Sequence, residues 1–135
     1  MRPRIVVFGA TGYTGGLVAE ALVRRGLRPD LAARSRHKLA SVAERLGGLD
    51  TRAADVTDPA SIHALVERGD LLLSTVGPFD RWGRPALDAA IDNGAHYLDS
   101  TGEWRFWPEE VTAAAAASAS AARRAVVAGG SGGSP

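Results

Sequence analysis

The chain has 135 residues, 45% of them hydrophobic, with a formal net charge of +1 and no cysteine. This length suits one domain with its own core, and the scattered charges form no basic block that would bind nucleic acid or an anionic membrane. Without cysteine there are no disulfides and no cysteine metal sites, and no apolar run approaches the roughly 20 residues that span a membrane. We therefore expect a single cytoplasmic domain with no nucleic-acid partner and no transmembrane segment.

The chain opens with the pattern of a strand, a glycine-rich turn and a helix. An apolar, β-branched run over residues 4–8 predicts the strand. Apolar residues then recur at helical spacing and predict a helix over residues 13–25, for which Gly26 is the C-terminal stop.

The turn between them has the spacing GxxGxxG. Gly9 permits a sharp turn, Gly12 lacks the Cβ that would keep a pyrophosphate off the backbone, and Gly15 permits close packing of helix on strand. The first amides and the dipole of the helix would then bind the pyrophosphate of a dinucleotide. The candidate binding residues are Gly9, Ala10, Thr11, Gly12, Tyr13, Thr14 and Gly15. A glycine-rich turn with a purely structural role is the alternative.

Strands and helices continue to alternate after this unit. We expect a strand over residues 29–34, a helix with Ser35 as its N-cap, and a weak strand over residues 49–54. The next helix is predicted to begin with Asp58-Pro59, a cap followed by a proline, and to end at Gly69.

The second half repeats this alternation. An almost unbroken apolar run over residues 70–76 predicts a strand buried on both faces. A helix is expected to begin at Pro85, and a strand follows over residues 96–98. Residues 108–124 predict a long alanine-rich helix, and residues 125–128 predict the last strand.

Six strands separated by helices require crossover connections and hence parallel neighbours. We therefore predict an α/β fold in one domain: a doubly wound, mostly parallel six-stranded sheet, that is, a Rossmann fold, with strand order 3-2-1-4-5-6. Ligands of such sheets bind outside the carboxyl ends of the strands, where the strand order reverses. The residues that directly follow each strand are therefore the ones to inspect.

After the second strand, an NAD-binding domain normally has an acid that holds the ribose 2′-hydroxyl. This chain has Arg34-Ser35-Arg36 there. A guanidinium can bind a 2′-phosphate through two charge-assisted hydrogen bonds and can stack on adenine. We therefore predict NADP(H) over NAD(H), with Arg34 and Ser35 at the cofactor. Solvated arginines at a helix start are the alternative.

Two further turns supply candidate residues. After the third strand, Asp55 could accept a hydrogen bond from the adenine amino group while Val56 packs on the ring; a simple loop carboxylate near Asp58 is equally compatible with the sequence. After the fourth strand, small residues would let the nicotinamide half approach the backbone, although a plain strand-ending turn would look the same. These residues are Ser74, Thr75, Val76, Gly77 and Pro78.

Groups for acid–base chemistry are few, and the catalytic residues stay unknown. There is no Tyr-x-x-x-Lys pair. His96 is expected to be structural, and His37 and His63 are expected on helix surfaces. Asp99 and Glu103 could transfer protons at the edge of the crevice, but capping the turn and binding arginine is the favoured role.

Several motifs together resemble the N-terminal cofactor domain of saccharopine dehydrogenase-like oxidoreductases, in particular the branch that includes trans-acting enoyl reductases. The resemblance covers about residues 4–128. It implies an NADP-dependent oxidoreductase, with the glycine turn, Arg34, Ser35 and the turn of residues 74–78 at the cofactor. The branch implies reduction of an enoyl or related lipid-like substrate. The motifs are GATGYTG at 9–15, ARS at 33–35 with Lys38-Leu39, GPF at 77–79 with Gly83, and YLDSTGE at 97–103.

Relatives in this family would continue into a substrate and dimerisation domain, whereas this chain ends in a Gly/Ser-rich stretch over residues 129–135. We expect residues 1–128 to form the dinucleotide-binding domain and the stretch to be a flexible tail. Turnover would then need the missing domain. The alternatives are a non-catalytic dinucleotide sensor and an inactive fragment. The aromatic residues Trp82, Trp104, Phe106 and Trp107 would be left exposed and would favour self-association.

Overall fold

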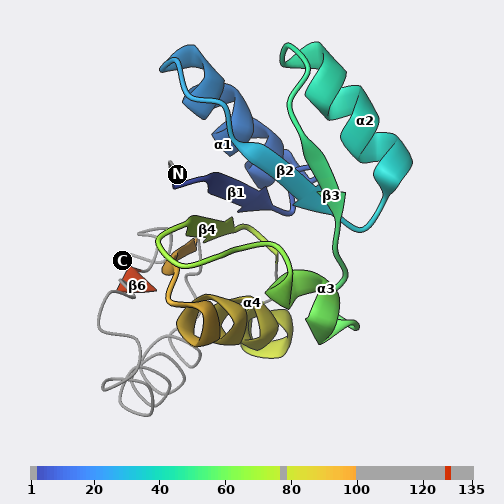
Figure 1. Cartoon of the computed structure of the whole chain (residues 1–135). Helices are drawn as coiled ribbons and strands as arrows, with labels where there is room; N and C mark the ends of the chain where they lie inside the picture. The colour runs from blue at the N-terminus through green and yellow to red at the C-terminus, as the bar shows by residue number, and fades with distance from the viewer. Residues whose placement is uncertain (1–2, 77–78, 100–126, 129–135) are drawn as a thin grey trace, which may run out of the picture.

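A parallel sheet lies between two layers of helices in the computed structural model, which describes residues 3–76, 79–99 and 127–128 (Figure 1). The sheet has six strands in the order β3-β2-β1-β4-β5-β6, which confirms the predicted topology. All five strand pairs are parallel. The elements are β1 (Ile5–Phe8), α1 (Tyr13–Arg24), β2 (Asp30–Ala33), α2 (Arg36–Arg45), β3 (Thr51–Ala53), α3 (Pro59–His63), β4 (Leu71–Ser74), α4 (Phe79–Asn93), β5 (His96–Asp99) and β6 (Val127–Ala128).

The alternation of side chains along the central strands divides the core into two layers. Successive residues of a strand point to opposite faces of the sheet. In β1, Val7 packs on one face with buried residues of α1 and α2, such as Ala19 and Leu39. Val6 and Phe8 pack on the other face, where α3 and α4 lie (Figure 1). The apolar run of β1 is thus explained by burial on both sides.

The helix predicted from Asp58-Pro59 to Gly69 is much shorter than expected. α3 does begin at Pro59, but it ends at His63, and the Asp58 side chain makes no capping hydrogen bond. The side chain of Asn93, in α4, forms hydrogen bonds with backbone carbonyls at and after the end of α3. Its Nδ2 donates to His63 O at 2.8 Å and to Val66 O at 3.0 Å. Leu65 and Val66 still enter the core. Tertiary hydrogen bonds thus replace the last helical turn.

The helix predicted to begin at Pro85 begins earlier. α4 starts at Phe79 and contains Pro85 within it. A proline inside a helix loses one backbone hydrogen bond and crowds the preceding turn. The residues that follow it, among them Ala86, Leu87 and Ala90, are fully buried against the sheet. Their packing outweighs the local cost of the proline, which the sequence pattern alone does not reveal.

Burial of β4 is less complete than predicted. Leu72 and Ser74 are buried, while Leu71 and Leu73 are of intermediate exposure. The predicted helix over residues 108–124 and the Gly/Ser-rich residues 129–135 lie outside the described residues. No helix in the described ranges is long and apolar enough to cross a membrane.

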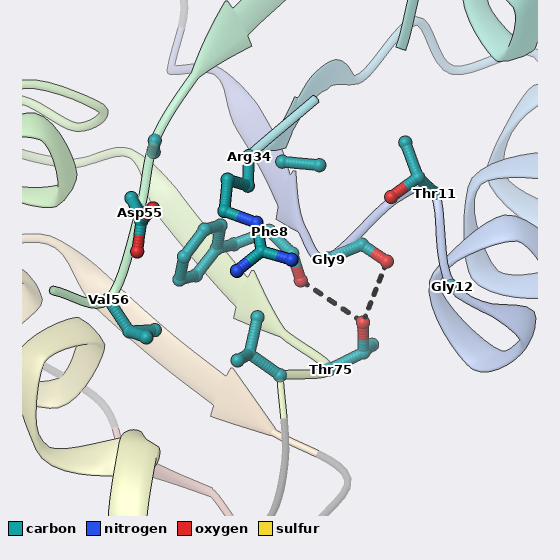
Figure 2. A pocket seen from close by; sticks show the side chains of 11 residues that line it. Phe8, Gly9, Thr11, Gly12, Arg34, Asp55, Val56 and Thr75 are labelled. Atoms are coloured by element: carbon teal, nitrogen blue, oxygen red, sulfur yellow. Dashed lines mark hydrogen bonds between the residues drawn. The ribbon is translucent and has the colours of Figure 1, made fainter. Parts of the chain in front are cut away.

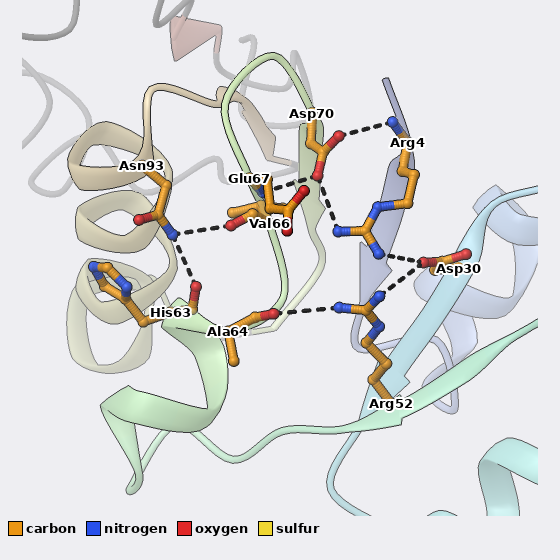
Figure 3. A network of polar contacts seen from close by, with 9 residues as sticks. All are labelled: Arg4, Asp30, Arg52, His63, Ala64, Val66, Glu67, Asp70 and Asn93. Atoms are coloured by element: carbon orange, nitrogen blue, oxygen red, sulfur yellow. Dashed lines mark hydrogen bonds and ion pairs between the residues drawn. The ribbon is translucent and has the colours of Figure 1, made fainter. Parts of the chain in front are cut away.

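A network of ion pairs ties together the amino ends of the strands (Figure 3). The buried carboxylate of Asp70 accepts from the Arg4 amide at 2.9 Å, from Arg4 Nη2 at 3.1 Å and from the Glu67 amide at 2.8 Å. Arg4 Nη1 also lies 3.3 Å from Asp30 Oδ2, and Arg52 Nη2 lies 3.8 Å from the same oxygen. Because the strands are parallel, this network lies at the edge opposite to their carboxyl ends.

Candidate dinucleotide-binding site

A pocket opens at the carboxyl ends of β1, β2, β3 and β4 (Figure 2). Its volume is about 280 Å³. It lies at the position where the strand order reverses, as predicted for a doubly wound sheet. The residues that line it are Phe8, Gly9, Thr11, Gly12, Ala33, Arg34, Ala54, Asp55, Val56, Thr75 and Val76.

Two glycines of the turn are required by its geometry. Gly9 has a φ of 93°, a backbone conformation that residues with a Cβ rarely adopt. Gly15 packs so closely on the turn that a Cβ there would overlap the Gly9 carbonyl oxygen. The separate roles predicted for these two glycines, in turning and in close packing, therefore match the structure.

The start of α1 presents open backbone amides. Gly12 is its N-cap residue and supplies no side-chain cap, and the first turn holds no acid. The Gly16 amide makes the first helical hydrogen bond, to Gly12 O at 2.9 Å. The amides of Tyr13, Thr14 and Gly15 precede that bond and are left for a ligand. An anion such as a pyrophosphate fits both these amides and the positive end of the helix dipole.

Arg34 follows β2 directly and lines the pocket, although its side chain is exposed. Figure 2 shows this side chain reaching from the end of β2 toward the pocket. The next residue, Ser35, is the N-cap of α2, as predicted, and its Oγ accepts from the Lys38 amide at 3.2 Å. The first turn of α2 contains no acid. Arg34 thus brings a positive charge to this corner of the pocket, close to the carboxylate of Asp55.

Asp55 follows β3, the strand next to β2, lines the pocket on the same side as Arg34, and is held in place by Thr57. The Asp55 Oδ1 atom accepts from the Thr57 amide and from the Thr57 hydroxyl, both at 2.9 Å. These hydrogen bonds, and next the charge of Arg34, lower the pKa of Asp55. At neutral pH its carboxylate is thus an acceptor only. The backbone carbonyl of Asp55 also accepts from the Asp58 amide at 2.9 Å. Asp55 is therefore part of a tight turn as well as of the pocket.

The turn after β4 contributes Thr75 and Val76 to the pocket, but not the preceding residue, Ser74. Thr75 and Val76 line the pocket, whereas the side chain of Ser74 is fully buried on the side of α4. Gly77 and Pro78, which were also predicted at the cofactor, lie outside the described residues.

Six residues of the predicted set within the described ranges do not line the pocket: Ser35 and Ser74, described above, and Ala10, Tyr13, Thr14 and Gly15. Ala10 is fully buried and its amide donates to Ala32 O at 3.1 Å. Tyr13 is 84% exposed, Thr14 is exposed and Gly15 is buried. For Tyr13, Thr14 and Gly15, the backbone amides rather than the side chains are the groups that could meet a ligand.

Sequence reasoning missed three pocket residues, Phe8, Ala33 and Ala54. Phe8 and Ala33 are the last residues of β1 and β2, and Ala54 follows β3 directly. The available signal was their position: a crevice at the carboxyl ends of strands includes the last strand residue as well as the loop after it. The sequence placed all three only within predicted strands.

A buried polar cluster lies below the carboxyl ends of β4 and β5. Ser74 and Asp99 are register partners, and Tyr97 lies two residues before Asp99 on the same face. All three are at most 3% exposed. Burial, and next the charge of Asp99, raise the pKa of Tyr97. Its phenol therefore stays protonated at neutral pH.

The remaining acid–base candidates give no catalytic assignment. His37 and His63 are exposed, as predicted, and His96 is the first residue of β5. Glu103, Trp104, Phe106 and Trp107 lie outside the described residues, as does the side chain of Trp82. Within the described ranges no group of His, Asp and Glu residues has the arrangement of a metal site.

Comparison with known proteins bears on this site. Residues 5–129 match the family described as "Saccharopine dehydrogenase NADP binding domain". The trans-acting enoyl reductase of Mycobacterium ulcerans (strain Agy99) is 38% identical over 108 residues, which cover 76% of this chain and 26% of the relative. The saccharopine dehydrogenase-like oxidoreductase of Bos taurus is 35% identical over 120 residues, which cover 76% of this chain and 28% of the relative. This chain thus spans about a quarter of the length of these curated relatives.

Solved structures share the fold. Saccharopine dehydrogenase (L-Glu forming) from Saccharomyces cerevisiae, in its apo form, has a TM-score of 0.64 and 17% sequence identity, over 74% of this chain and 22% of the other. Triphenylmethane reductase from Citrobacter sp., complexed with NADP(H), has a TM-score of 0.62 and 24% identity, over 88% of this chain and 45% of the other.

Proposed function

Since the chain belongs to the saccharopine dehydrogenase NADP-binding domain family, we propose that this pocket binds NADP(H), with Arg34 as the residue that recognises the 2′-phosphate. The observation that carries the proposal is the position of Arg34. It directly follows β2 and lines the pocket at the point where an NAD-specific site would place a carboxylate. A carboxylate there would repel a 2′-phosphate, whereas a guanidinium can bind it with two parallel hydrogen bonds.

The other walls of the pocket fit the rest of the dinucleotide. The open amides at the start of α1 suit the pyrophosphate, and Gly12 lacks the Cβ that would hold it away. Asp55, ionised and fixed by Thr57, suits the adenine amino group, with Val56 and Phe8 as apolar neighbours. Thr75 and Val76, which line the pocket at the end of β4, are the residues proposed to meet the nicotinamide half.

We further propose that the domain serves an oxidoreductase that reduces an enoyl or related lipid-like or small-molecule substrate. Bound NADPH would supply the hydride for such a reaction. The support is the similarity to trans-acting enoyl reductases, of which this chain spans about a quarter. Substrate contacts and the proton donor are assigned to a further domain, and residues 1–128 to the cofactor domain. A cytoplasmic location is part of the same proposal.

Titration of the purified chain with NADPH and with NADH tests the cofactor assignment, with energy transfer from the tryptophans to the reduced nicotinamide as the signal. We expect wild-type protein to prefer NADPH. Arg34→Ala should weaken NADPH binding by roughly 10–100-fold, the size of a lost hydrogen-bonded charge pair, and leave NADH binding almost unchanged. Arg45→Ala, an exposed arginine at the other end of α2, is the control. Equal NADPH affinity of Arg34→Ala and wild type would refute the assignment.

Self-association of this chain is a separate part of the proposal. It is supported by the aromatic residues near the GPF and YLDSTGE motifs, whose apolar side chains would favour contact between copies of the chain. Sedimentation velocity over a range of protein concentrations tests it. A concentration-independent monomer that binds no hydrophobic dye would contradict it.

A further inference from the structure

Thr75 joins the two halves of the pocket. It follows β4, and its hydroxyl points toward the end of β1 and the glycine turn (Figure 2). The Thr75 Oγ1 atom lies 3.1 Å from Phe8 O and 3.4 Å from Gly9 O, so its single proton is shared between two carbonyls. The Thr75 amide also donates to Phe8 O, at 3.0 Å. Backbone and side chain of one residue thus hold the end of β1.

The hydroxyl occupies space that the two glycines leave open. A Cβ on Gly9 would lie 2.6 Å from Thr75 Oγ1, and a Cβ on Gly15 would lie 2.8 Å from the same atom. Any side chain at either glycine would therefore displace the hydroxyl. The glycines and Thr75 form one packed unit that links β1, α1 and the end of β4.

The Gly9 carbonyl oxygen connects the Thr75 hydroxyl to the glycine turn. Besides the Thr75 hydroxyl, it accepts the Gly12 amide at 3.0 Å. Gly12 in turn is the N-cap of α1. The orientation of the Gly9 peptide therefore sets the path of the turn, and with it the direction of the open amides at the start of the helix.

We propose that Thr75 is a positioning residue for the cofactor: its hydroxyl fixes the glycine turn that receives the pyrophosphate to the strand end that receives the nicotinamide. This inference rests on the proposed NADP(H) function and gives a specific role to the hydroxyl of Thr75, which the sequence predicted only as one of several small residues beside the nicotinamide half. At the proposed adenosine end of the pocket, Arg34 and Asp55 follow other strands, β2 and β3, and the Thr75 hydroxyl bonds neither of them.

The test compares two ligands and two variants in the full chain. NADPH reports on the whole pocket, whereas adenosine 2′-monophosphate has no pyrophosphate and reports on the adenosine end. Thr75→Val removes the hydroxyl at almost constant volume, and Thr75→Ser keeps it. Thr51→Val, at an exposed position of β3, controls for the loss of a threonine hydroxyl elsewhere. Affinities are measured by calorimetry for NADPH and by NMR titration for the monophosphate.

We expect Thr75→Val to weaken NADPH binding roughly 3–10-fold, the effect of one lost hydrogen bond, with adenosine 2′-monophosphate affinity within about twofold of wild type. Thr75→Ser and Thr51→Val should bind both ligands like wild type. An unchanged NADPH affinity in Thr75→Val would overturn the inference. So would an equal loss for both ligands, because that pattern indicates a general structural defect.

Two further outcomes are distinguishable. If Thr75→Val does not unfold cooperatively, the comparison is made with Thr75→Ala, which adds no methyl group next to the two carbonyls, and the same criteria apply. If wild-type protein binds neither ligand, the proposed cofactor function itself is wrong. Failure of the function and failure of the role of Thr75 therefore give different results.

Discussion

Gly15, in the first turn of α1, packs directly on Gly9 at the end of β1: a Cβ on Gly15 would overlap the Gly9 carbonyl oxygen and lie 2.6 Å from its carbonyl carbon. Both obstacles are backbone atoms, so no side-chain rotation can relieve them. The next residue, Gly16, differs sharply, because a Cβ there would meet nothing closer than Ala10 O at 3.8 Å. Two adjacent glycines of one helix therefore have opposite tolerances for a methyl group.

Gly15→Ala should destabilise the fold by about 1–3 kcal/mol, as expected for overpacking, and weaken NADPH binding more than tenfold because the turn must move. Gly16→Ala is the matched control. It should leave binding unchanged and stabilise the helix by about 0.5–1 kcal/mol. Urea unfolding and NADPH titration of both variants check this. Similar behaviour of the two variants would show that the close approach of Gly15 to Gly9 is not required.

Asp55→Ala should reduce the affinity for NADPH and for NADH by the same factor, roughly 5–10-fold, because the adenine group is common to both. This pattern differs from that of Arg34→Ala, which should affect NADPH alone. Asp58→Ala is the control, since Asp58 is an exposed carboxylate of the same turn that makes no capping hydrogen bond. A change in the NADPH-to-NADH preference of Asp55→Ala would place Asp55 near the 2′-phosphate rather than at the adenine.

Asp70→Ala should lower the free energy of unfolding by about 2–4 kcal/mol, because it removes three hydrogen bonds to Arg4 and Glu67 and leaves the part-buried guanidinium of Arg4 with only Asp30 of its two carboxylate partners. The folded protein should keep its NADPH affinity, because this network lies at the opposite edge of the sheet. Asp92→Ala, which removes an exposed contact with His63, should cost no more than about 0.5 kcal/mol. Denaturant titrations measure both; equal effects would contradict the prediction.

Asp30 should give an unusual pH dependence of stability. Burial raises its pKa above the ordinary value of 3.8, against the attraction of Arg4 and Arg52. A carboxyl group whose pKa is higher in the folded than in the unfolded state takes up its proton preferentially on folding, so its contribution to stability increases as the pH falls.

Wild-type protein should therefore gain stability relative to Asp30→Asn as the pH falls from neutral toward 3.8, where the folded state is protonated before the unfolded chain. The asparagine cannot titrate and provides the reference. Urea unfolding of both proteins at pH 7 and at about pH 4 measures the difference. A relative loss of wild-type stability at the lower pH would show that the two arginines outweigh burial.

The sequence by itself determined the topology and much of the pocket. The glycine spacing, the N-cap Ser35 and the alternation of apolar runs with helical segments are local signals, and local signals define the order of the elements. Given that order, the parallel sheet and the crevice at its carboxyl ends follow from the rules of chain connection. Arg34, Asp55 and Thr75 were found in this way, because each directly follows a strand or lies within two residues of its end.

Only the tertiary structure decided features that depend on contacts between distant segments. α3 ends early because Asn93, some 30 residues away, donates to the His63 carbonyl. Pro85 is tolerated inside α4 because the residues after it are buried against the sheet. The role of the Thr75 hydroxyl depends on its approach to Phe8 and Gly9, more than 60 positions earlier. No local pattern encodes such distances, because they result from how the elements pack together.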